Sequence, residues 1–419
     1  MKTENQEVLA ERIVYGESQA NATLLNLRGK VYQQYDGAGV VTNTGRNPAT
    51  NQDEAYDFKG NLLRSTRKLL QNYKDPVDWL QNPTLETEVF ARSTVYDALT
   101  RPITLTTPDN STIRPTYNEA NLLNAVDVNL QGEQQNDQPV WTPFVKNIDY
   151  DAKGQRQLIR YGNDVVTTYE YDDKTFRLIH LRTDRGNSFP ADRPKGIQNL
   201  FYAYDPVGNI TEIRDDAQQT VFFNNAMVTP RNQYVYDALY RLIQAKGREH
   251  KGQVADPQPE YNSNDFPRVN LPHPNEISAM RDYTEQYEYD SVGNILRMIH
   301  EADNGNWTRR YDYELTNNRL RNTSLPGDLP DLSSLPPRYL YDEHGSMTKM
   351  PHLTQMDWDF KDQLQRVDLG GGGVAYYVYD AAGQRVRKVI ERQNSRRQKE
   401  RIYLGGFEIF REYDGSGNT

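Results

Sequence analysis

The sequence lacks several features that would narrow its function at once. Its 419 residues include no cysteine, which excludes a disulfide framework and thiol chemistry. No window approaches about 18 apolar residues, so no membrane-spanning helix is expected. The segment from Met1 to Glu7 has no apolar stretch, so no signal peptide is visible. The net charge of −9 disfavours nucleic acid as a partner, because nucleic-acid-binding domains usually present a basic face.

Apolar residues are also scarce, at 36% of the chain. Low hydrophobicity can indicate disorder, but disordered chains are poor in aromatic residues, and this chain contains 29 tyrosines. A buried tyrosine contributes a large apolar area and keeps a hydroxyl group for a hydrogen bond. The composition therefore indicates a folded protein with much surface and a thin core built from tyrosine rings.

One short motif recurs along the chain: aromatic–x–Tyr–Asp, two variable residues, Gly, a small polar residue and an aliphatic residue. Clear copies run from Tyr202 to Ile210 and from Tyr287 to Ile295. The alternate aromatic residues predict a β-strand with both rings on one face. Asp followed three residues later by Gly predicts a tight turn closed by a left-handed glycine, so each motif predicts a β-hairpin. This spacing occurs at Asp36/Gly39, Asp57/Gly60, Asp151/Gly154, Asp205/Gly208, Asp290/Gly293, Asp342/Gly345 and Asp380/Gly383.

A second motif alternates with the first from Tyr56 onward. It lacks the glycine and ends in Arg followed by an aliphatic residue or Pro. Copies run over residues 96–102, 171–178 and 236–242, with a variant at 313–320 and a degenerate copy at 360–367. If every strand pair reverses direction, the two turn types would lie at opposite ends of a long sheet. Both types on one edge would contradict this hypothesis.

The spacing of the motifs is irregular, unlike the fixed period of about 40 residues in a propeller. The extra length falls in proline-rich segments near 253–283 and 322–338, which predict loop insertions. Helix is expected to be scarce, and residues 66–73 and 115–125 are only modest candidates. We therefore expect residues 1–419 to form a single repeat region.

The alternation of Tyr-Asp-x-x-Gly with Tyr-Asp-x-x-x-Arg-Leu resembles the Rhs/YD-repeat family. The stretches 204–218 and 236–250 resemble the B and C components of bacterial insecticidal toxin complexes (Tc toxins) and SpvB-like relatives, and residues 56–61 and 161–163 are further similar motifs. The resemblance covers the chain from about Ile13 to its end. It implies an all-β fold, in which a continuous strip of antiparallel hairpins spirals into a hollow shell or part of one.

The same resemblance implies a structural encapsulation module without enzymatic activity. Such a module is a wall section of a toxin-complex shell that sequesters a cytotoxic C-terminal polypeptide before delivery, so a secreted or extracellular virulence protein is expected. The implied partners are other shell parts (B- and C-type subunits) and the enclosed toxin polypeptide. Exposed sheet edges would also allow self-association. The family's Rhs-associated core and toxin segment are not found in the sequence, and residues 413–419 resemble the middle of another repeat, so we expect a fragment.

The alternative is a cell-surface adhesion or carbohydrate-binding YD-repeat scaffold. Repeated aromatic clusters in the long loops would favour it, and Tyr261, Phe266 and Trp307 give weak support.

No residue is predicted to be catalytic, cofactor-binding or metal-binding. The aspartate of each Tyr-Asp pair is interpreted as a turn residue. Residues 149–154 superficially resemble the start of a calcium loop, but Lys153 occupies a ligand position. The run Gly370–Gly373 is expected to be a turn between two strands, since no phosphate-loop lysine follows. The basic run from Arg385 to Arg401 is expected to be a solvated hairpin with an Arg-rich tip. The histidines are scattered without metal-ligand spacing: His180, His250, His273, His300, His344 and His352.

Overall fold

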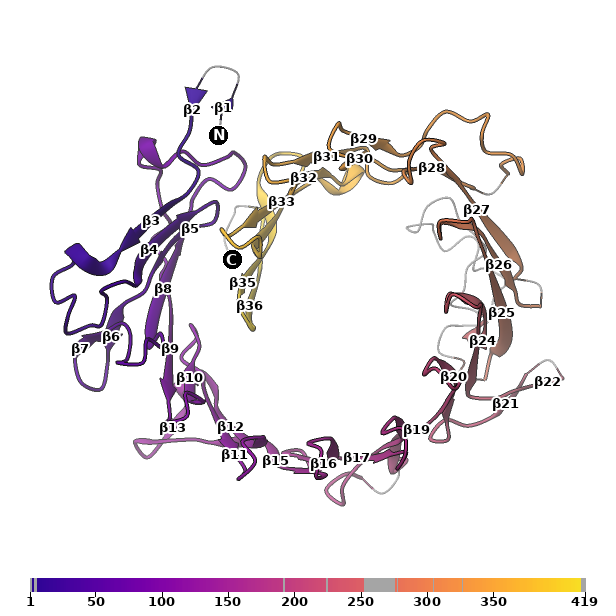
Figure 1. Ribbon diagram of the computed structural model, residues 1–419, viewed down its shortest axis with the longest axis horizontal. Coiled ribbons are helices and arrows are strands. Elements are labelled where there is room, and N and C mark those ends of the chain that lie inside the picture. Colours follow the sequence, from indigo (N-terminus) through magenta and orange to yellow (C-terminus); the bar gives the residue numbers. More distant parts are fainter. Residues whose placement is uncertain are drawn as a thin grey trace. The chain divides into compact units, whose positions relative to one another are not determined.

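The computed structural model describes residues 2–3, 6–190, 193–223, 225–251, 276, 278–303, 305–325 and 327–415. In these ranges the regular elements are β-strands and short 3₁₀ turns, and no α-helix occurs. The strands form antiparallel hairpins, so the predicted all-β hairpin fold is confirmed. The chain divides into two compact units, of which unit 1 comprises residues 1–143 and 340–419 and unit 2 comprises residues 144–339. Figure 1 labels strands of both units.

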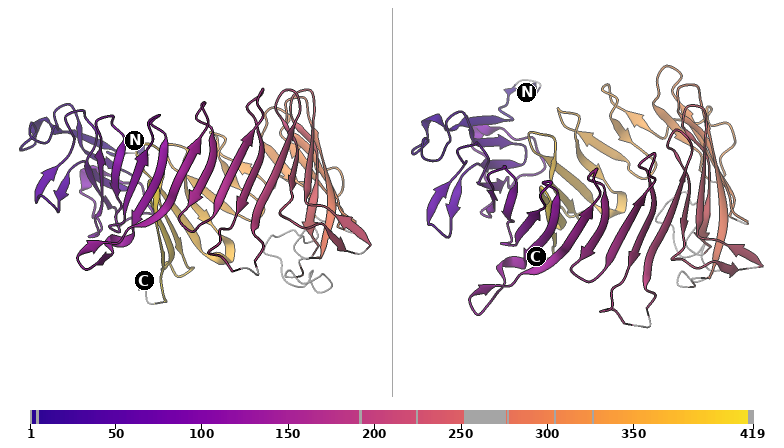
Figure 2. Two further views of the ribbon diagram at one scale, coloured as in Figure 1. Left: turned by 90° about the horizontal axis from the view of Figure 1, so that it is seen from below. Right: turned by 60° about the horizontal axis from the view of Figure 1, so that its bottom comes forward.

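Unit 2 is a strip of strands that lie side by side mostly in sequence order (Figure 2). A short separate hairpin, β21 (Val221–Phe223) and β22 (Ala226–Val228), interrupts the order. The strands of the strip are β15 (Thr142–Tyr150), β16 (Arg156–Tyr161), β17 (Val166–Tyr171), β18 (Leu178–Asp184), β19 (Gly196–Tyr204), β20 (Ile210–Asp215), β23 (Arg231–Tyr236), β24 (Leu242–His250), β25 (Met280–Tyr289), β26 (Ile295–Glu301), β27 (Trp307–Tyr313) and β28 (Leu320–Thr323).

Unit 1 contains two larger sheets and several small hairpins. The first sheet is built from β3 (Arg12–Tyr15), β4 (Val31–Asp36), β5 (Gly39–Thr42), β8 (Arg64–Leu69), β9 (Phe90–Tyr96), β10 (Pro102–Thr106), β11 (Thr112–Tyr117) and β12 (Leu123–Asn129). The second, six-stranded sheet consists of β31 (Gln355–Trp358), β32 (Leu364–Asp368), β33 (Val374–Tyr379), β34 (Arg385–Glu391), β35 (Arg397–Leu404) and β36 (Phe407–Glu412).

The small hairpins of unit 1 pair β1 (Lys2–Thr3) with β2 (Gln6–Glu7), β6 (Gly45–Asn47) with β7 (Gln52–Glu54), β13 (Gln134–Gln135) with β14 (Gln138–Pro139) and β29 (Leu340–Tyr341) with β30 (Met347–Lys349). The 3₁₀ turns are η1 (Gly16–Ser18), η2 (Trp79–Gln81), η3 (Leu130–Gly132) and η5 (Gly370–Gly372). The last of these joins β32 to β33, as expected for the glycine run.

Both segments proposed as modest helix candidates form strands instead. Residues 66–69 belong to β8, and residues 115–125 contain the end of β11, a turn and the start of β12. Thr66 pairs with Ala91 on β9, and Pro115 pairs with Val126 on β12. The helix prediction is wrong because pairing with neighbouring strands outweighs a weak local preference.

Six of the seven Asp-x-x-Gly turns have the predicted geometry, and in the remaining one Asp36 pairs directly with Gly39 across a two-residue loop. In the turn between β19 and β20, the Gly208 N–H donates to the Asp205 carbonyl oxygen at 3.2 Å, and the Asp205 side chain accepts from the Asn209 N–H at 2.9 Å. A bulge lies at Tyr204, directly before the turn, where the strand register shifts. All seven glycines of this spacing have positive φ angles, between +78° and +138°, which other residues adopt only at a cost.

The Arg-type turns at Asp97 and Asp237 form the same loop with a different residue at the left-handed position, whereas the turn at Asp172 is one residue longer. Tyr240, with φ of +62°, replaces the glycine and donates its N–H to the Asp237 carbonyl oxygen at 3.0 Å. Arg241 Nε donates to Asp237 Oδ2 at 2.7 Å, as Asn209 Nδ2 donates to Asp205 Oδ2 at 2.8 Å in the Gly-type turn. Arg and Asn therefore occupy one structural position and make one equivalent hydrogen bond.

Both turn types lie on the same edge of the sheet in unit 2, so the hypothesis of opposite edges is wrong. Arg177, in the Arg-type turn between β17 and β18, donates to the carbonyl oxygens of Asp205 at 2.9 Å and Pro206 at 3.2 Å in the following Gly-type turn. Arg241 contacts the Asp290 carbonyl oxygen in the same way, at 3.2 Å. Each motif spans a whole hairpin of two strands, so successive motif turns return to the same edge.

Of the two proline-rich segments, the first lies mostly outside the described residues, and β25 begins at Met280. In the second, the described residues between β28 and β29 form no strand.

Candidate functional site

The tyrosine that precedes a turn residue bonds its hairpin to the preceding one. The Tyr204 hydroxyl donates to the Leu178 carbonyl oxygen at 2.6 Å, and Leu178 is the first residue of the strand that returns from the preceding turn. We call this contact the tyrosine lock. It recurs in Tyr117 with Pro102, Tyr236 with Ile210, Tyr289 with Leu242, Tyr313 with Ile295 and Tyr379 with Leu364, at 2.7–3.0 Å. The motif thus needs the hydroxyl group of tyrosine as well as its ring.

Several turn aspartates have a pKa below the usual range because the turn itself donates hydrogen bonds to them. Asp36 differs, since burial raises its pKa and its carboxylate pairs with Arg67 at 2.7 Å. The backbone N–H of Arg241, with its guanidinium, lowers the pKa of Asp237 below the usual range, and Arg101 does the same for Asp97. Burial acts to raise the pKa of Asp205, but hydrogen bonds from Asn209 outweigh this and lower it. The interpretation of these aspartates as turn residues is therefore confirmed.

A buried ion network centres on Arg387 in β34 of unit 1, whose side chain is 1% exposed. Its guanidinium donates to Glu400 at 2.6 Å, to the Leu70 carbonyl oxygen at 2.8 Å and to Glu86 at 2.7 Å. Burial acts to raise the pKa of Glu400, yet Arg387 and the Tyr413 hydroxyl outweigh it and hold the pKa low. Such a pair is stable only because its hydrogen bonds replace those lost to water.

The network continues through Glu391 and the segment that follows β8. Tyr73 donates its hydroxyl to Glu391 at 2.6 Å, and Lys74 lies 2.7 Å from the same carboxylate. Burial and the bond to Glu391 raise the pKa of the Tyr73 hydroxyl to about 12. Beside the ions lies an apolar cluster with members in both sheets: Ala38, Leu69, Phe90, Val386 and Ile402. Polar and apolar contacts together pack the two sheets of unit 1.

These contacts correct the expectation for the basic run from Arg385 to Arg401. The run is a hairpin, as predicted, and its tip at residues 393–396 is exposed. It is not solvated throughout, because Arg387 is buried and Arg397 pairs with Glu86 at 3.4 Å. Sequence reasoning missed this because the acidic partner Glu86 lies about 300 residues away in the chain.

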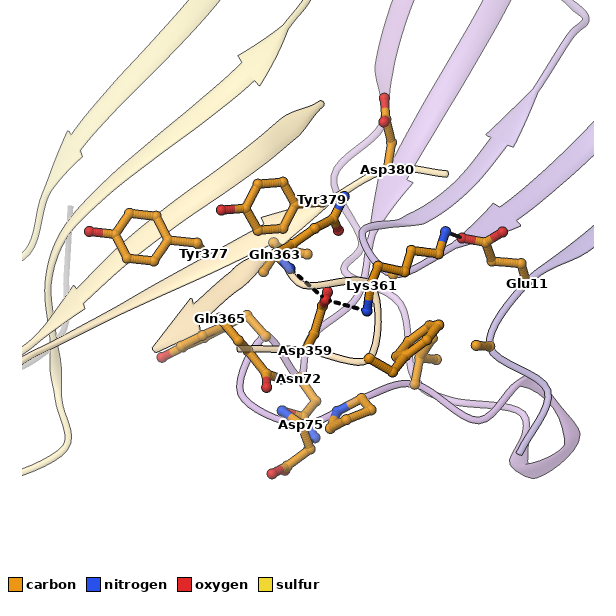
Figure 3. Close-up of a pocket in the computed structure, with 17 residues that line it drawn as sticks. Glu11, Asn72, Asp75, Asp359, Lys361, Gln363, Gln365, Tyr377, Tyr379 and Asp380 are labelled. Atoms are coloured by element: carbon orange, nitrogen blue, oxygen red, sulfur yellow. Dashed lines mark hydrogen bonds and ion pairs between the residues drawn. The ribbon is translucent and has the colours of Figure 1, made fainter. Parts of the chain in front are cut away.

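A small cavity of about 60 Å³ lies in unit 1 beside the turn from Asp359 to Gln363 (Figure 3). Lys361 extends to Glu11 and forms an ion pair with it, while the Asp359 side chain accepts from the Gln363 N–H at 2.9 Å. Sites for small molecules usually enclose about 300–1,000 Å³. This cavity therefore has room for water but not for a substrate.

Buried His300 in unit 2 was not singled out from the sequence. It is 3% exposed, lies 3.2 Å from Glu249 and 3.1 Å from Glu285, and stacks on Trp307 with a ring separation of 5.0 Å. These residues meet because β25, β26 and β27 place Glu285, His300 and Trp307 in register. His344 is exposed and bonds to Asp362 at 2.7 Å, and His273 lies outside the described residues.

Within the described ranges, no group of three or more His, Cys, Asp or Glu side chains is arranged to hold a metal ion. The segment that resembles a calcium loop is a turn, in which the Asp151 side chain accepts from the N–H groups of Lys153 and Gln155. None of the described segments forms a helix with the length and hydrophobicity of a membrane span.

Comparison with known proteins identifies relatives of the whole chain. Toxin subunit YenC2 of Yersinia entomophaga is 32% identical over 418 residues, which cover 96% of this chain and 40% of that protein. Toxin subunit YenC1 of the same organism is 31% identical, over 99% of this chain and 41% of that protein. The chain is homologous to these toxin-complex subunits. No family model matches it.

Solved toxin-complex structures share the fold. The crystal structure of TcdB2-TccC3 superposes with a TM-score of 0.78 and 27% identity, over 99% of this chain and 19% of that one. The Photorhabdus luminescens Tc holotoxin pore with the TccC3-D651A mutation superposes with a TM-score of 0.79 and 27% identity, over 99% of this chain and 18% of that one. The resemblance to Tc components is thereby confirmed. The chain spans about two fifths of the curated relatives and under a fifth of the solved chains.

Proposed function

We propose that this toxin-complex homologue is a wall section of a shell that sequesters a cytotoxic polypeptide before delivery. The observation that carries the proposal is the homology to toxin subunits over nearly the whole chain. The proposed role is steric and needs no reaction. A continuous hairpin sheet keeps water and proteases from an enclosed chain as long as its strands do not separate.

The contacts between hairpins suit such a wall. Besides the strand ladder, consecutive hairpins are joined by the tyrosine lock and, at Arg-type turns, by a guanidinium that reaches the next turn. Tyr204 and Arg177 make both contacts between one pair of hairpins, and each contact reaches a residue adjacent in sequence to a member of the other. Local opening of a sheet needs all such bonds to break together, so redundant contacts oppose it.

The proposal extends to partners and location. Other B- and C-type shell subunits would complete the wall, and a solved relative is the crystal structure of TcdB2 together with TccC3. The enclosed partner would be a toxin polypeptide, and the assembly would act outside the producing cell without enzymatic activity of this chain. Paired or covered strand edges are a general requirement for such a sheet, because free edges promote aggregation.

The test is protection of a reporter segment. A protease-sensitive polypeptide is fused after Thr419, and the fusion is co-expressed with the other shell subunits and then challenged with protease. We expect the reporter to survive far longer in the assembly than when it is expressed alone. Equal rates of digestion in the two samples would refute encapsulation.

An adhesion or carbohydrate-binding scaffold gains no support from the described residues. Trp307, one of the three aromatic residues that offered it weak support, stacks within the sheet on His300 with an interplanar angle of 6°. Tyr261 and Phe266 lie outside the described residues.

A further inference from the structure

One face of the six-stranded sheet in unit 1 carries a row of cations between aromatic rings. Lys388 on β34 pairs in register with Tyr377 on β33 and with Arg401 on β35, and Arg401 pairs with Phe410 on β36. Arg385 lies three residues before Lys388 on the same strand. We call Arg385, Lys388 and Arg401 the cationic patch. Its strands, β33 to β36, form the C-terminal part of the sheet (Figure 1).

Each cation of the patch lies close to at least one aromatic ring of the same sheet. Arg385 and Lys388 lie 5.9 Å and 5.6 Å from the centre of the Tyr377 ring, and Arg385 also lies 4.6 Å from the Tyr403 ring. Arg401 lies 5.4 Å from the Phe410 ring, which is 52% exposed. Aromatic faces attract cations, so the rings hold the positive groups in place on an open surface.

Negative charge does not balance the patch. Arg401 has one acidic partner, Glu408 at 2.9 Å, and among the described residues neither Arg385 nor Lys388 has an ion-pair partner. Burial, with the charges of Arg385 and Arg401, lowers the pKa of Lys388 below its usual range. A crowded cation without a counter-ion is the arrangement that an added anion stabilises.

We propose that this face of β33–β36 binds an acidic stretch of polypeptide through Arg385, Lys388 and Arg401. The occupant follows from charge and shape. The cations require carboxylates, and an open sheet face with interspersed rings accepts an extended chain rather than an enclosed small molecule. The inference concerns this sheet alone and does not depend on encapsulation.

Nucleic acid fits the same hairpin less well. Arg387 and Arg397 are committed to Glu86, and Arg392 and Arg396 donate to carbonyl oxygens of Tyr413 and Gly415. Of the patch cations, Arg385 and Lys388 have no acidic partner among the described residues, and Arg401 has the single exposed partner Glu408. A chain with a net charge of −9 would repel the continuous charge of a nucleic acid strand more strongly than a short acidic segment.

The experiment measures binding of an oligoglutamate peptide to the whole chain at low salt, with an oligoglutamine peptide of equal length for comparison. We expect oligoglutamate alone to bind, and the double variant Arg385→Gln/Lys388→Gln to weaken binding by about tenfold or more. The matched control is Arg46→Gln, which removes a cation from an exposed hairpin of the same unit, where Arg46 pairs with Asp53 at 3.3 Å. This control should bind like the unaltered chain.

A second readout does not depend on the folding of the variant. In the unaltered chain the pKa of Lys388, followed by NMR, should rise when oligoglutamate is added. Absence of peptide binding, an equal loss in Arg46→Gln, or an unchanged Lys388 titration would overturn the proposal. Tighter binding of a single-stranded oligonucleotide than of oligoglutamate would also overturn it, in favour of nucleic acid.

Discussion

The hydroxyl group of Tyr204, at the end of β19, lies 2.6 Å from the carbonyl oxygen of Leu178, at the start of the neighbouring strand β18 in unit 2. The contact bridges a bulge, because the register between β17 and β18 shifts next to Leu178. A backbone oxygen at a bulge lacks the regular ladder partner, and the tyrosine supplies a donor. Tyr204 therefore links its own hairpin to the preceding hairpin in the sequence through a side-chain hydrogen bond.

Replacing this hydroxyl should cost stability without changing the fold. We expect Tyr204→Phe to lower the free energy of unfolding by about 1 kcal/mol, since the ring stays and one hydrogen bond is lost. The double variant Tyr204→Phe/Tyr289→Phe should lower the free energy of unfolding by roughly the sum of the two single losses, because the two hydroxyl groups share no hydrogen-bond partner. Urea denaturation followed by circular dichroism measures both.

The matched control is Tyr202→Phe, on the same strand and the same face. No hydrogen bond of its hydroxyl group is found among the described residues, so the free energy of unfolding should hardly change. If Tyr202→Phe and Tyr204→Phe cost the same, the tyrosine lock contributes nothing beyond the general effect of removing a hydroxyl.

The left-handed position of an Arg-type turn offers a gain in stability. Thr100 has φ of +66°, a region that β-branched residues avoid, and its side chain is exposed. We expect Thr100→Gly to raise the free energy of unfolding by about 0.5–1 kcal/mol, after allowance for the greater freedom of glycine in the unfolded chain.

Thr100→Ala is the control for that prediction, because alanine keeps the Cβ atom that disfavours positive φ. It should give clearly less stabilisation than Thr100→Gly in the same urea experiment. A gain of equal size in both variants would point to the threonine hydroxyl or methyl group rather than to the backbone angle.

Local features of the fold could be predicted from sequence, whereas contacts between hairpins could not. The spacing of Asp205 and Gly208 was sufficient for the turn, because the bonds that stabilise it are local. The common edge of the two turn types was missed, since it depends on how whole hairpins follow one another. A further turn at Asn118 was also missed, because Asn118 and Asn121, with φ of +64°, replace the motif's Asp and Gly.

The ion network around Arg387 was beyond sequence reasoning for a different reason. A basic residue in a basic run gives no local sign of burial, and its acidic partners come from another strand and from the distant segment that contains Glu86. His300 is similar, since its neighbours meet only through the register of three strands. Sequence periodicity specifies which face a residue occupies but not which distant charge lies opposite.

The buried pair predicts a large cost for removing one partner. Arg387→Met leaves the carboxylate of Glu400 buried without its guanidinium, so the free energy of unfolding should fall by about 3–5 kcal/mol. The double variant Arg387→Met/Glu400→Met should lower the free energy of unfolding by less than the sum of the two single losses, because no uncompensated charge remains from that pair.

An exposed ion pair provides the comparison. Arg297 and Glu288 lie 2.5 Å apart, with side chains 48% and 41% exposed. Arg297→Met should therefore cost no more than about 1 kcal/mol in the same assay. A cost for Arg387→Met that falls within the range of Arg297→Met would show that the network is not a significant contributor to unit 1.

The ion pair between Asp328 and Arg338 in unit 2 predicts a dependence on pH. Arg338 donates two hydrogen bonds to this carboxylate, at 2.6 Å and 2.8 Å, and lowers the pKa of Asp328 from 3.8 to about 2. The folded state thus binds a proton at the Asp328 carboxylate less tightly than the unfolded state does. The stabilisation is fully present above about pH 4 and is lost as the pH falls toward 2.

The test compares the unaltered chain with Asp328→Asn. The urea midpoint of the variant should be lower at about pH 5, and the difference between the two proteins should narrow at about pH 3, because the unfolded chain then takes up a proton at Asp328 that the folded chain, with its pKa of about 2, still largely excludes. Arg338→Met should show the same narrowing, since it removes the group that lowers the pKa. A difference that stays constant between these pH values would mean that the ionised form of Asp328 is not what stabilises the loop.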